Sequence, residues 1–169
     1  IGTLGTGVVS SLASTGMTTP DAVLLQSQLR TFADQRVSYV AMEASSIGIE
    51  EHRLDGTQVR VAVFTNLTQD HLDYHGDMTA YGQAKARLFA WAGLQSCVIN
   101  IEDPFGAELA QSLQHKSVDS WTCSRWGGTG RIQARQVMSA HAGLTLDIAE
   151  GEQVVPLQTA LIGDFNIDN

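Results

Sequence analysis

The chain has few cysteines and no long apolar run. Its two cysteines among 169 residues, Cys97 and Cys123, do not have the spacing of a metal site. A disulfide framework is therefore not predicted, and a reducing, cytoplasmic compartment is expected. No apolar run approaches the length of a membrane span, so we expect no membrane insertion. The first residues, Ile1–Gly7, lack the features of a signal peptide, so the chain is expected to begin mid-fold.

Basic residues are also scarce. Ten Lys and Arg face 18 Asp and Glu, and the formal net charge is −8. Because the bases form no cluster, we expect no nucleic-acid partner. An acidic protein that handles phosphates needs Mg²⁺ or a few local bases to offset repulsion. The length and the 43% hydrophobic content are those of one globular domain with a real core.

Apolar runs alternate with helical patterns over the first 125 residues. We expect strands at 37–42, 61–64, 96–100 and 117–122, and helices at 20–32, 77–91 and 104–113. This alternation predicts an α/β fold with a mostly parallel sheet and crossover helices. Residues 1–4 are expected to end a strand, and residues 5–17, rich in Gly, Ser and Thr, are expected to form a loop.

The pattern changes after the Gly-rich segment 126–130, which we interpret as a linker. Residues 131–139, 143–149 and 153–160 alternate apolar and polar and are separated by turn signals. They predict a small antiparallel β meander. The expected division is an α/β core over 1–125, the meander over 126–162 and the start of a helix over 163–169.

The segment 61–75 concentrates the candidate chemistry. A buried strand at 61–64 is followed by Asp70, His71, Asp73 and His75. Ligands bind outside the carboxyl ends of parallel strands. If strand 37–42 is a neighbour, Glu43 at its end would meet His71, and together they could hold Mg²⁺ or Mn²⁺. On spacing alone, a solvated Glu and a capping His are a slightly simpler interpretation.

Lys85 is unusual because it falls inside an apolar stripe of the predicted helix 77–91. Partial burial lowers the pKa of a lysine. The neutral amine can react with CO₂ to give a carbamate, which can bind a metal. From the residues alone, a lysine whose stem lies on the apolar surface and whose head reaches water is the simpler interpretation.

Several other polar residues could contact a substrate. Thr18, Thr19 and Ser45 could donate hydroxyl groups, and Arg53 could bind a carboxylate with its two-pronged guanidinium. Thr19 is also a candidate helix cap, with Pro20 at the first helical position. Taken singly, the roles of cap, loop and surface charge are favoured.

Four segments together occur in the order and spacing of the Mur ligases. They are Thr18–Asp21, Met42–Ser46, Phe64–Gly76 and Tyr81–Phe89. Residues 163–169 resemble the end of that family's central domain, so the resemblance covers essentially the whole chain. It implies a central ATPase domain that is similar to P-loop NTPases. It also implies that the UDP-binding and amino-acid-binding domains of the family lie outside this chain.

The resemblance implies an ATP-dependent ligase of peptidoglycan precursor synthesis. Family members activate a substrate carboxylate as an acyl phosphate, which an amine attacks to give an amide. The branch most similar to this chain acts on D-Glu of UDP-MurNAc-L-Ala-D-Glu and adds meso-diaminopimelate or L-lysine, and the chain does not distinguish these two amines. Mg²⁺ or Mn²⁺ would neutralise and position the anions. The implied partners are these small molecules, and we expect a monomer.

The resemblance also assigns roles to individual residues. The implied metal ligands are Glu43, His71 and Lys85, with Lys85 as N6-carboxylysine and with Lys85 and His71 also catalytic. The implied contacts to the UDP-MurNAc-dipeptide are Thr18, Thr19, Ser45, Glu51 and Arg53, and the implied nucleotide contacts are Asn66 and Asn166.

The sequence departs from the family in three ways. The family's phosphate loop, which contains Gly-Lys-Thr, precedes a strand like Ile1–Thr3 and is not in this chain. The amino-acid-binding domain is also outside it, so we expect the chain to be inactive alone. A family His is Ile47 here and a family Gln is Glu51, whose carboxylate would repel an anionic substrate.

Two other functions remain open from the sequence. A metal-dependent hydrolase could use Asp70, His71 and Asp73, although the Thr18–Asp21 and Met42–Ser46 segments argue against it. A non-catalytic Mur-like binding protein would be free to lose Glu43, His71 and Lys85, yet all three are present.

Overall fold

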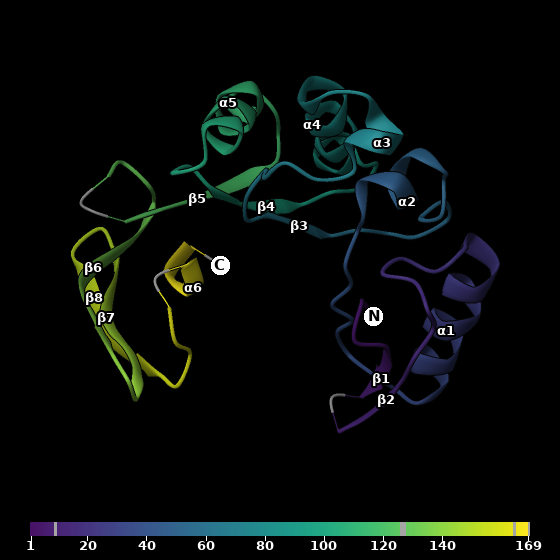
Figure 1. Ribbon diagram of the computed structural model, residues 1–169, viewed down its shortest axis with the longest axis horizontal. Helices are drawn as coiled ribbons and strands as arrows, with labels where there is room; N and C mark the ends of the chain where they lie inside the picture. The colour runs from purple at the N-terminus through teal and green to yellow at the C-terminus, as the bar shows by residue number, and fades with distance from the viewer. Residues whose placement is uncertain (9, 126–127, 164, 169) are drawn as a thin grey trace. The chain divides into compact units, whose positions relative to one another are not determined.

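A computed structural model describes residues 1–8, 10–125, 128–163 and 165–168 (Figure 1). The chain divides into two compact units. One consists of Ile1–Val59 and Gln69–Ala92, and the other of Arg60–Thr68 and Gly93–Asn169. Within the described residues, none of the helices combines the length and apolar character needed to cross a bilayer.

The first unit opens with a short hairpin where a loop was expected. Strands β1 (Thr6–Val8) and β2 (Ser11–Ala13) pair antiparallel. Gly7 has a φ of 146°, and a Cβ there would lie 2.2 Å from the carbonyl oxygen of Ser11. A glycine-rich stretch can therefore form a tight hairpin, which the loop prediction for 5–17 missed.

Helix α1 (Ala22–Asp34) begins later than expected. Its cap is Asp21, whose carboxylate accepts hydrogen bonds from the backbone N–H groups of Val23 and Leu24, each at 3.0 Å. The predicted cap, Thr19, is wrong because that residue is buried and its hydroxyl is bonded elsewhere. Leu25 and Phe32 are buried, as the helical periodicity predicted.

The expected strand at 37–42 is not present. The segment pairs with no strand in the described part of the chain, and Val37, Tyr39 and Val40 are exposed. The start of the chain lies against the end of this segment, where the Ile1 amino group donates to the Ala41 carbonyl at 2.9 Å. Apolar β-branched residues favour a strand only when a partner ladder satisfies the backbone. Residues 1–4 likewise form a turn with a Gly2–Gly5 bridge rather than a strand end.

Four short helical elements complete the first unit. They are α2 (Ser46–Glu50), α3 (Leu72–His75), α4 (Met78–Ala86) and the 3₁₀ helix η1 (Arg87–Ala90). Asp77 caps α4 by accepting from the Ala80 N–H at 2.8 Å. The helix predicted over 77–91 therefore exists, but its last turn is 3₁₀. Helix α4 packs against both α2 and α3.

The second unit is built on one six-stranded sheet. Its strands are β3 (Val61–Phe64), β4 (Ser96–Asn100), β5 (Asp119–Arg125), β6 (Ile132–Ala140), β7 (Gly143–Glu150) and β8 (Gln153–Thr159). They lie side by side in chain order. The pairs from β3 to β6 are parallel, and β6 to β8 form the expected antiparallel meander.

The α/β fold is therefore confirmed, and the meander continues the parallel sheet. Helix α5 (Pro104–Leu113), capped by Asp103, packs on β4 and β5. Strand β5 begins two residues later than expected. Helix α6 (Phe165–Asp168) packs on β5, and its Ile167 contacts the meander core of Ala134, Leu144 and Leu146. Residues 126–127 of the expected linker, and residues 164 and 169 of the expected helix start, lie outside the described residues.

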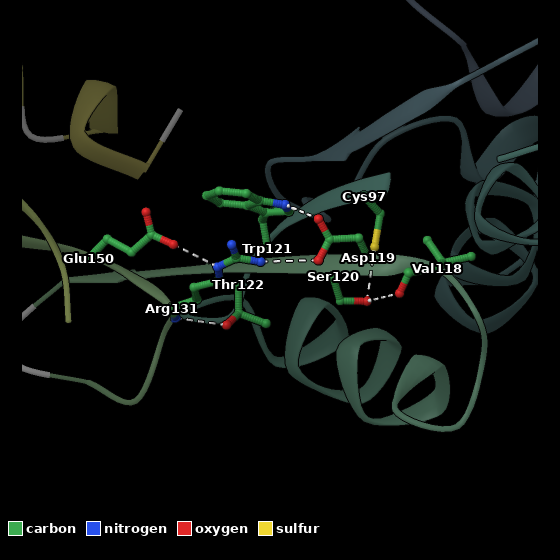
Figure 2. Close-up of polar contacts among 8 residues, drawn as sticks. All are labelled: Cys97, Val118, Asp119, Ser120, Trp121, Thr122, Arg131 and Glu150. Atoms are coloured by element: carbon green, nitrogen blue, oxygen red, sulfur yellow. Dashed lines mark hydrogen bonds and ion pairs between the residues drawn. The ribbon is translucent and has the colours of Figure 1, made fainter. Parts of the chain in front are cut away.

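A polar cluster joins the parallel and antiparallel parts of the sheet (Figure 2). The Trp121 indole N–H donates to Asp119 at 2.7 Å. Arg131 donates to Asp119 at 3.1 Å and to Glu150 at 2.9 Å. The hydrogen bond to Glu150 raises the pKa of the Arg131 guanidinium. Arg131, which directly precedes β6, thus links Asp119 of β5 to Glu150 of β7.

Candidate functional site

Glu43 is held by the first turn of the chain. Its carboxylate accepts hydrogen bonds from the Thr3 hydroxyl at 2.7 Å and from the Thr3 N–H at 3.2 Å. The Thr3 hydroxyl also lies 3.0 Å from that of Thr18. A Cβ on Gly2 would lie 2.3 Å from the Glu43 carboxylate, so only glycine allows this approach. Glu43 remains exposed and therefore available to a ligand.

Thr19 fixes the backbone around Glu43. Its hydroxyl donates to the Glu43 carbonyl at 2.8 Å and accepts from the Ser45 N–H at 2.9 Å. Ser45 in turn caps α2 by accepting from the Gly48 N–H at 3.0 Å. Thr19 is 0% exposed, whereas Thr18 and Ser45 are half-buried. The buried threonine therefore acts as a scaffold, and its two neighbours keep accessible surface.

Arg53 and Glu51 form an ion pair next to this segment. Arg53 Nε donates to the Glu51 carboxylate at 2.9 Å, and its Nη1 donates to the Thr19 carbonyl at 3.0 Å. The Glu51 charge, expected to repel an anionic substrate, is thus offset by a neighbouring guanidinium. The same pairing leaves Arg53 less net charge to offer a carboxylate.

His71 presents its ring from the start of α3. It has a left-handed backbone conformation, with φ of 54°, which is uncommon outside glycine. Its Nε2 lies 3.4 Å from the Asp70 carboxylate, which also accepts from the His71 N–H at 2.8 Å. The exposed ring meets Tyr81 edge to face, with the centroids 6.0 Å apart. A carboxylate therefore orients this imidazole, as it does for many histidines that bind metals.

Lys85 also contacts Tyr81, the ring that His71 meets. Its Nζ is 5.0 Å from the centroid of the Tyr81 ring. Burial lowers the pKa of the half-buried Lys85 amine, and the Asp70 carboxylate partly opposes this effect. The structure thus gathers His71, Asp70 and Lys85 around one tyrosine. The neutral, reactive form of the amine is more accessible here than in an exposed lysine.

The predicted site residues fall into separate groups. Glu43, Thr18, Thr19, Ser45, Glu51 and Arg53 form one connected group in the first unit, and His71 and Lys85 belong to the same unit. Across the described residues, no three His, Cys, Asp or Glu side chains form a metal-binding cluster. Any metal set that includes Glu43 and His71 would therefore need a further ligand of another kind.

The two predicted nucleotide contacts belong to the second unit. The side-chain amide of Asn66 lies just after β3 and donates to the Thr65 hydroxyl at 3.4 Å. Asn166, in α6, donates to the Ile162 carbonyl at 2.9 Å. This second bond holds the Asn166 side chain against the backbone carbonyl of a residue four positions earlier.

Sequence reasoning missed two residues that organise the site. Thr3 holds Glu43, and no local pattern marks it. Tyr81 was assigned no role in the site, yet its ring contacts both His71 and Lys85. Its position four residues before Lys85 on one helix was the available signal.

The chain is similar to known proteins along its whole length. The family model described as Mur ligase middle domain matches residues 1–169. A UDP-N-acetylmuramoyl-L-alanyl-D-glutamate--2,6-diaminopimelate ligase from Acidovorax sp. (strain JS42) is 52% identical over 169 residues, covering 100% of this chain and 34% of that protein. The protein of the same name from Xanthomonas campestris pv. campestris (strain 8004) is 43% identical, with the same coverage.

A solved structure agrees with these relatives. A UDP-N-acetylmuramoyl-L-alanyl-D-glutamate--2,6-diaminopimelate ligase superposes with a TM-score of 0.90 at 34% identity, covering 99% of this chain and 34% of that one. The chain thus spans about a third of the length of the curated relatives it matches. The match over every residue, together with the fold, shows that the chain belongs to the Mur ligase middle domain family.

Proposed function

We propose that this chain is the middle domain of a longer ATP-dependent ligase that adds the third residue to a peptidoglycan stem peptide. The supporting observation is the half-buried Lys85 amine, placed against Tyr81 beside His71 and Asp70. The names of the relatives support 2,6-diaminopimelate as the incoming amine. L-lysine is the alternative amine.

The proposed reaction has two steps. A carboxylate oxygen of D-Glu in UDP-MurNAc-L-Ala-D-Glu attacks the γ-phosphorus of ATP, and ADP leaves. The amine nitrogen then attacks the acyl carbon, inorganic phosphate leaves, the nitrogen loses a proton to solvent, and an amide forms. Thr18, Ser45 and Arg53 would bind the dipeptide substrate. Thr19 holds the backbone of Ser45 in place, and Glu51 reduces the net positive charge that Arg53 presents. Asn66 and Asn166 would contact the nucleotide.

The donor set suits Mg²⁺ or Mn²⁺ if Lys85 carries a carboxyl group. Glu43 and His71 are exposed, and each has a neighbour that orients it. The Lys85 nitrogen would form a bond to the carbon of CO₂ and lose a proton to solvent, giving a carbamate. Glu43, His71 and this carbamate would hold the ion, which supplies charge neutralisation for the phosphates.

The activity is best tested in a chimera. The matching third of the Acidovorax relative would be replaced by this chain, because the relative supplies the rest of the ligase. We expect ADP release and amide formation that need both UDP-MurNAc-L-Ala-D-Glu and diaminopimelate. Lys85→Ala or His71→Ala should lower kcat by about 100-fold or more, in the range seen when one charge-stabilising group is lost.

Two results would contradict the proposal. One is a folded chimera that makes no amide with either diaminopimelate or lysine. The other is metal-dependent hydrolysis of phosphate esters by this chain, which would favour the hydrolase alternative.

The 169-residue chain alone is expected to show no ligase turnover. Calorimetric titration of this chain is expected to show no binding of Mg²⁺-ATP.

The carbamate has its own test. With ¹³C-labelled bicarbonate, NMR of the chain should show a carbamate signal that is lost in Lys85→Arg. A folded chain without this signal would remove Lys85 from the ligand set.

We also propose that the ligase is a monomer located in the cytoplasm. Sedimentation would check the oligomeric state, and cell fractionation would check the location.

A further inference from the structure

His75 forms a buried polar network with two residues of α2. Its side chain is 1% exposed. Its Nε2 lies 2.9 Å from the Ser46 hydroxyl, and its Nδ1 lies 3.3 Å from the Glu50 carboxylate. Ser46, His75 and Glu50, here called the His75 network, have no part in the proposed reaction described so far.

The contacts run from Ser46 to His75 to Glu50, as in the catalytic triad of a hydrolase. The burial of Ser46 and His75 nevertheless excludes nucleophilic attack by Ser46. Ser46 is 1% exposed, so a substrate carbonyl has no access to its hydroxyl. The Glu50 carboxylate favours a proton on Nδ1 of His75, which leaves Nε2 to accept from the Ser46 hydroxyl. The network therefore fixes the position of Ser46 instead of activating it.

The network touches the surroundings of both Glu43 and Lys85. The His75 ring stacks on Tyr81, with the centroids 5.2 Å apart and an angle of 29° between the planes, and Tyr81 faces Lys85. On the other side, Ser46 follows Ser45, whose N–H is bonded to Thr19, and Thr19 holds the Glu43 carbonyl. A continuous series of contacts thus runs from the Glu43 segment to the helix that carries Lys85.

We propose that His75 is a positioning residue, which holds the Glu43–Ser45 segment in register with Tyr81 and Lys85. Without an acceptor at Nε2, the Ser46 hydroxyl would be buried and unpaired, which favours a shift of α2. A shift of 1 Å in a ligand or substrate contact is enough to cost much of a catalytic rate. The consequence for catalysis rests on the proposed function, whereas the mechanical coupling does not.

Two substitutions separate the hydrogen bond from the packing. His75→Phe keeps an aromatic ring against Tyr81 but removes both nitrogens. His75→Gln loses the ring but keeps an amide oxygen that can accept from Ser46. In the chimera, His75→Phe should lower kcat by about 10–100-fold. The KM for ATP should change by less than about threefold, because a positioning loss acts mainly on the chemical step.

The outcomes are distinct. His75→Gln should restore most of the kcat, and the matched control His141→Phe, in the exposed turn between β6 and β7, should leave kcat unchanged. Wild-type kcat in His75→Phe would overturn the proposal. Equal loss in folded His75→Gln and His75→Phe would also overturn it, because packing alone would then explain the effect.

A second measurement does not depend on ligase activity. In amide NMR spectra of the 169-residue chain, His75→Phe should shift the signals of both Ser45 and Lys85, and His75→Gln should shift them less. Shifts confined to the neighbours of residue 75 would overturn the coupling. If His75→Phe does not fold, Ser46→Ala removes the same bond from its other end and leaves His75 Nε2 buried without a donor, so the signal of Lys85 should again shift; an unchanged Lys85 signal would overturn the coupling. An inactive wild-type chimera with these shifts would count against the proposed function alone.

Discussion

The guanidinium carbon of Arg131 lies over the Trp121 ring, 3.4 Å from its centroid. Asp119 accepts hydrogen bonds from both side chains, so the pair is fixed from a third position. Arg131 directly precedes β6, and its backbone N–H donates to the Thr122 hydroxyl at 3.0 Å. The contact therefore sets the start of β6 against β5, which is the last parallel pair before the antiparallel meander.

Removing this contact should weaken the second unit. Arg131→Ala is expected to lower the urea midpoint, and Arg131→Lys should fall between Arg131→Ala and wild type because lysine lacks the planar fork. Added salt should screen the pairs with Asp119 and Glu150 more than the stack on Trp121. An unchanged midpoint in Arg131→Ala would show that the strands are aligned by their ladders alone.

The meander core should be sensitive to lost volume. Leu144 is 1% exposed and packs with Ala134 and Leu146. Leu144→Ala should therefore reduce the free energy of unfolding by about 2–5 kcal/mol. Val155, on β8, is 62% exposed, and Val155→Ala should change stability by no more than about 0.5 kcal/mol. Denaturant titration of both variants checks the contrast, and equal effects would contradict the assignment of the core.

Gly48 should tolerate no side chain. A Cβ there would lie 2.9 Å from Cβ and Cγ2 of Thr19 and from the Ser45 hydroxyl. Gly48→Ala is expected to cost about 1–3 kcal/mol of stability through overpacking. Thr19→Ser removes the methyl group but keeps the hydroxyl, so the double variant should lose less than the sum of the single losses. Strict additivity in denaturant titrations would show that the helix moves away freely.

Lys85 should make stability rise with pH in alkaline solution. Burial lowers the pKa of Lys85 in the folded chain below its ordinary value of 10.5. Between these two pKa values the unfolded chain binds more protons than the folded chain, so the free energy of unfolding increases with pH. Below the folded pKa the amine is charged in both states, and the cost of burying it is fully present.

The matched variant is Lys85→Met, which keeps the stem and removes the charge. We expect wild type to gain stability relative to Lys85→Met as pH rises toward 10.5. Denaturant titrations without CO₂, over a series of alkaline pH values, measure this difference. A difference that stays constant with pH would mean that the amine is solvated in the folded chain.

The periodicity of apolar residues correctly predicted those helices and strands that are determined by their local sequence. Strands β3 and β4, helix α5 and the meander were correct because apolar spacing and turn residues determine them locally. The segment 37–42 was wrong because a strand needs a partner that composition does not reveal. The cap moved from Thr19 to Asp21 because Thr19 satisfies the backbone around Glu43 instead.

The site was predictable only in part. Glu43, His71 and Lys85 were found from residue type and the Mur ligase resemblance, and their roles remain proposals. The network of Ser46, His75 and Glu50 was not found, since the bonding residues lie 25 or more positions apart in sequence and the signal is burial. The pairing of Arg53 with Glu51 also needed the geometry, although the two residues are near neighbours.

The two compact units are interleaved along the chain, since residues 60–68 belong to one unit and the residues on either side belong to the other. A single cut of the polypeptide therefore cannot separate the two units cleanly, because any fragment that holds one unit whole also carries residues of the other. A recombination event or an engineered exchange with one crossover would always combine parts of both. The two units are therefore expected to be inherited and transplanted together.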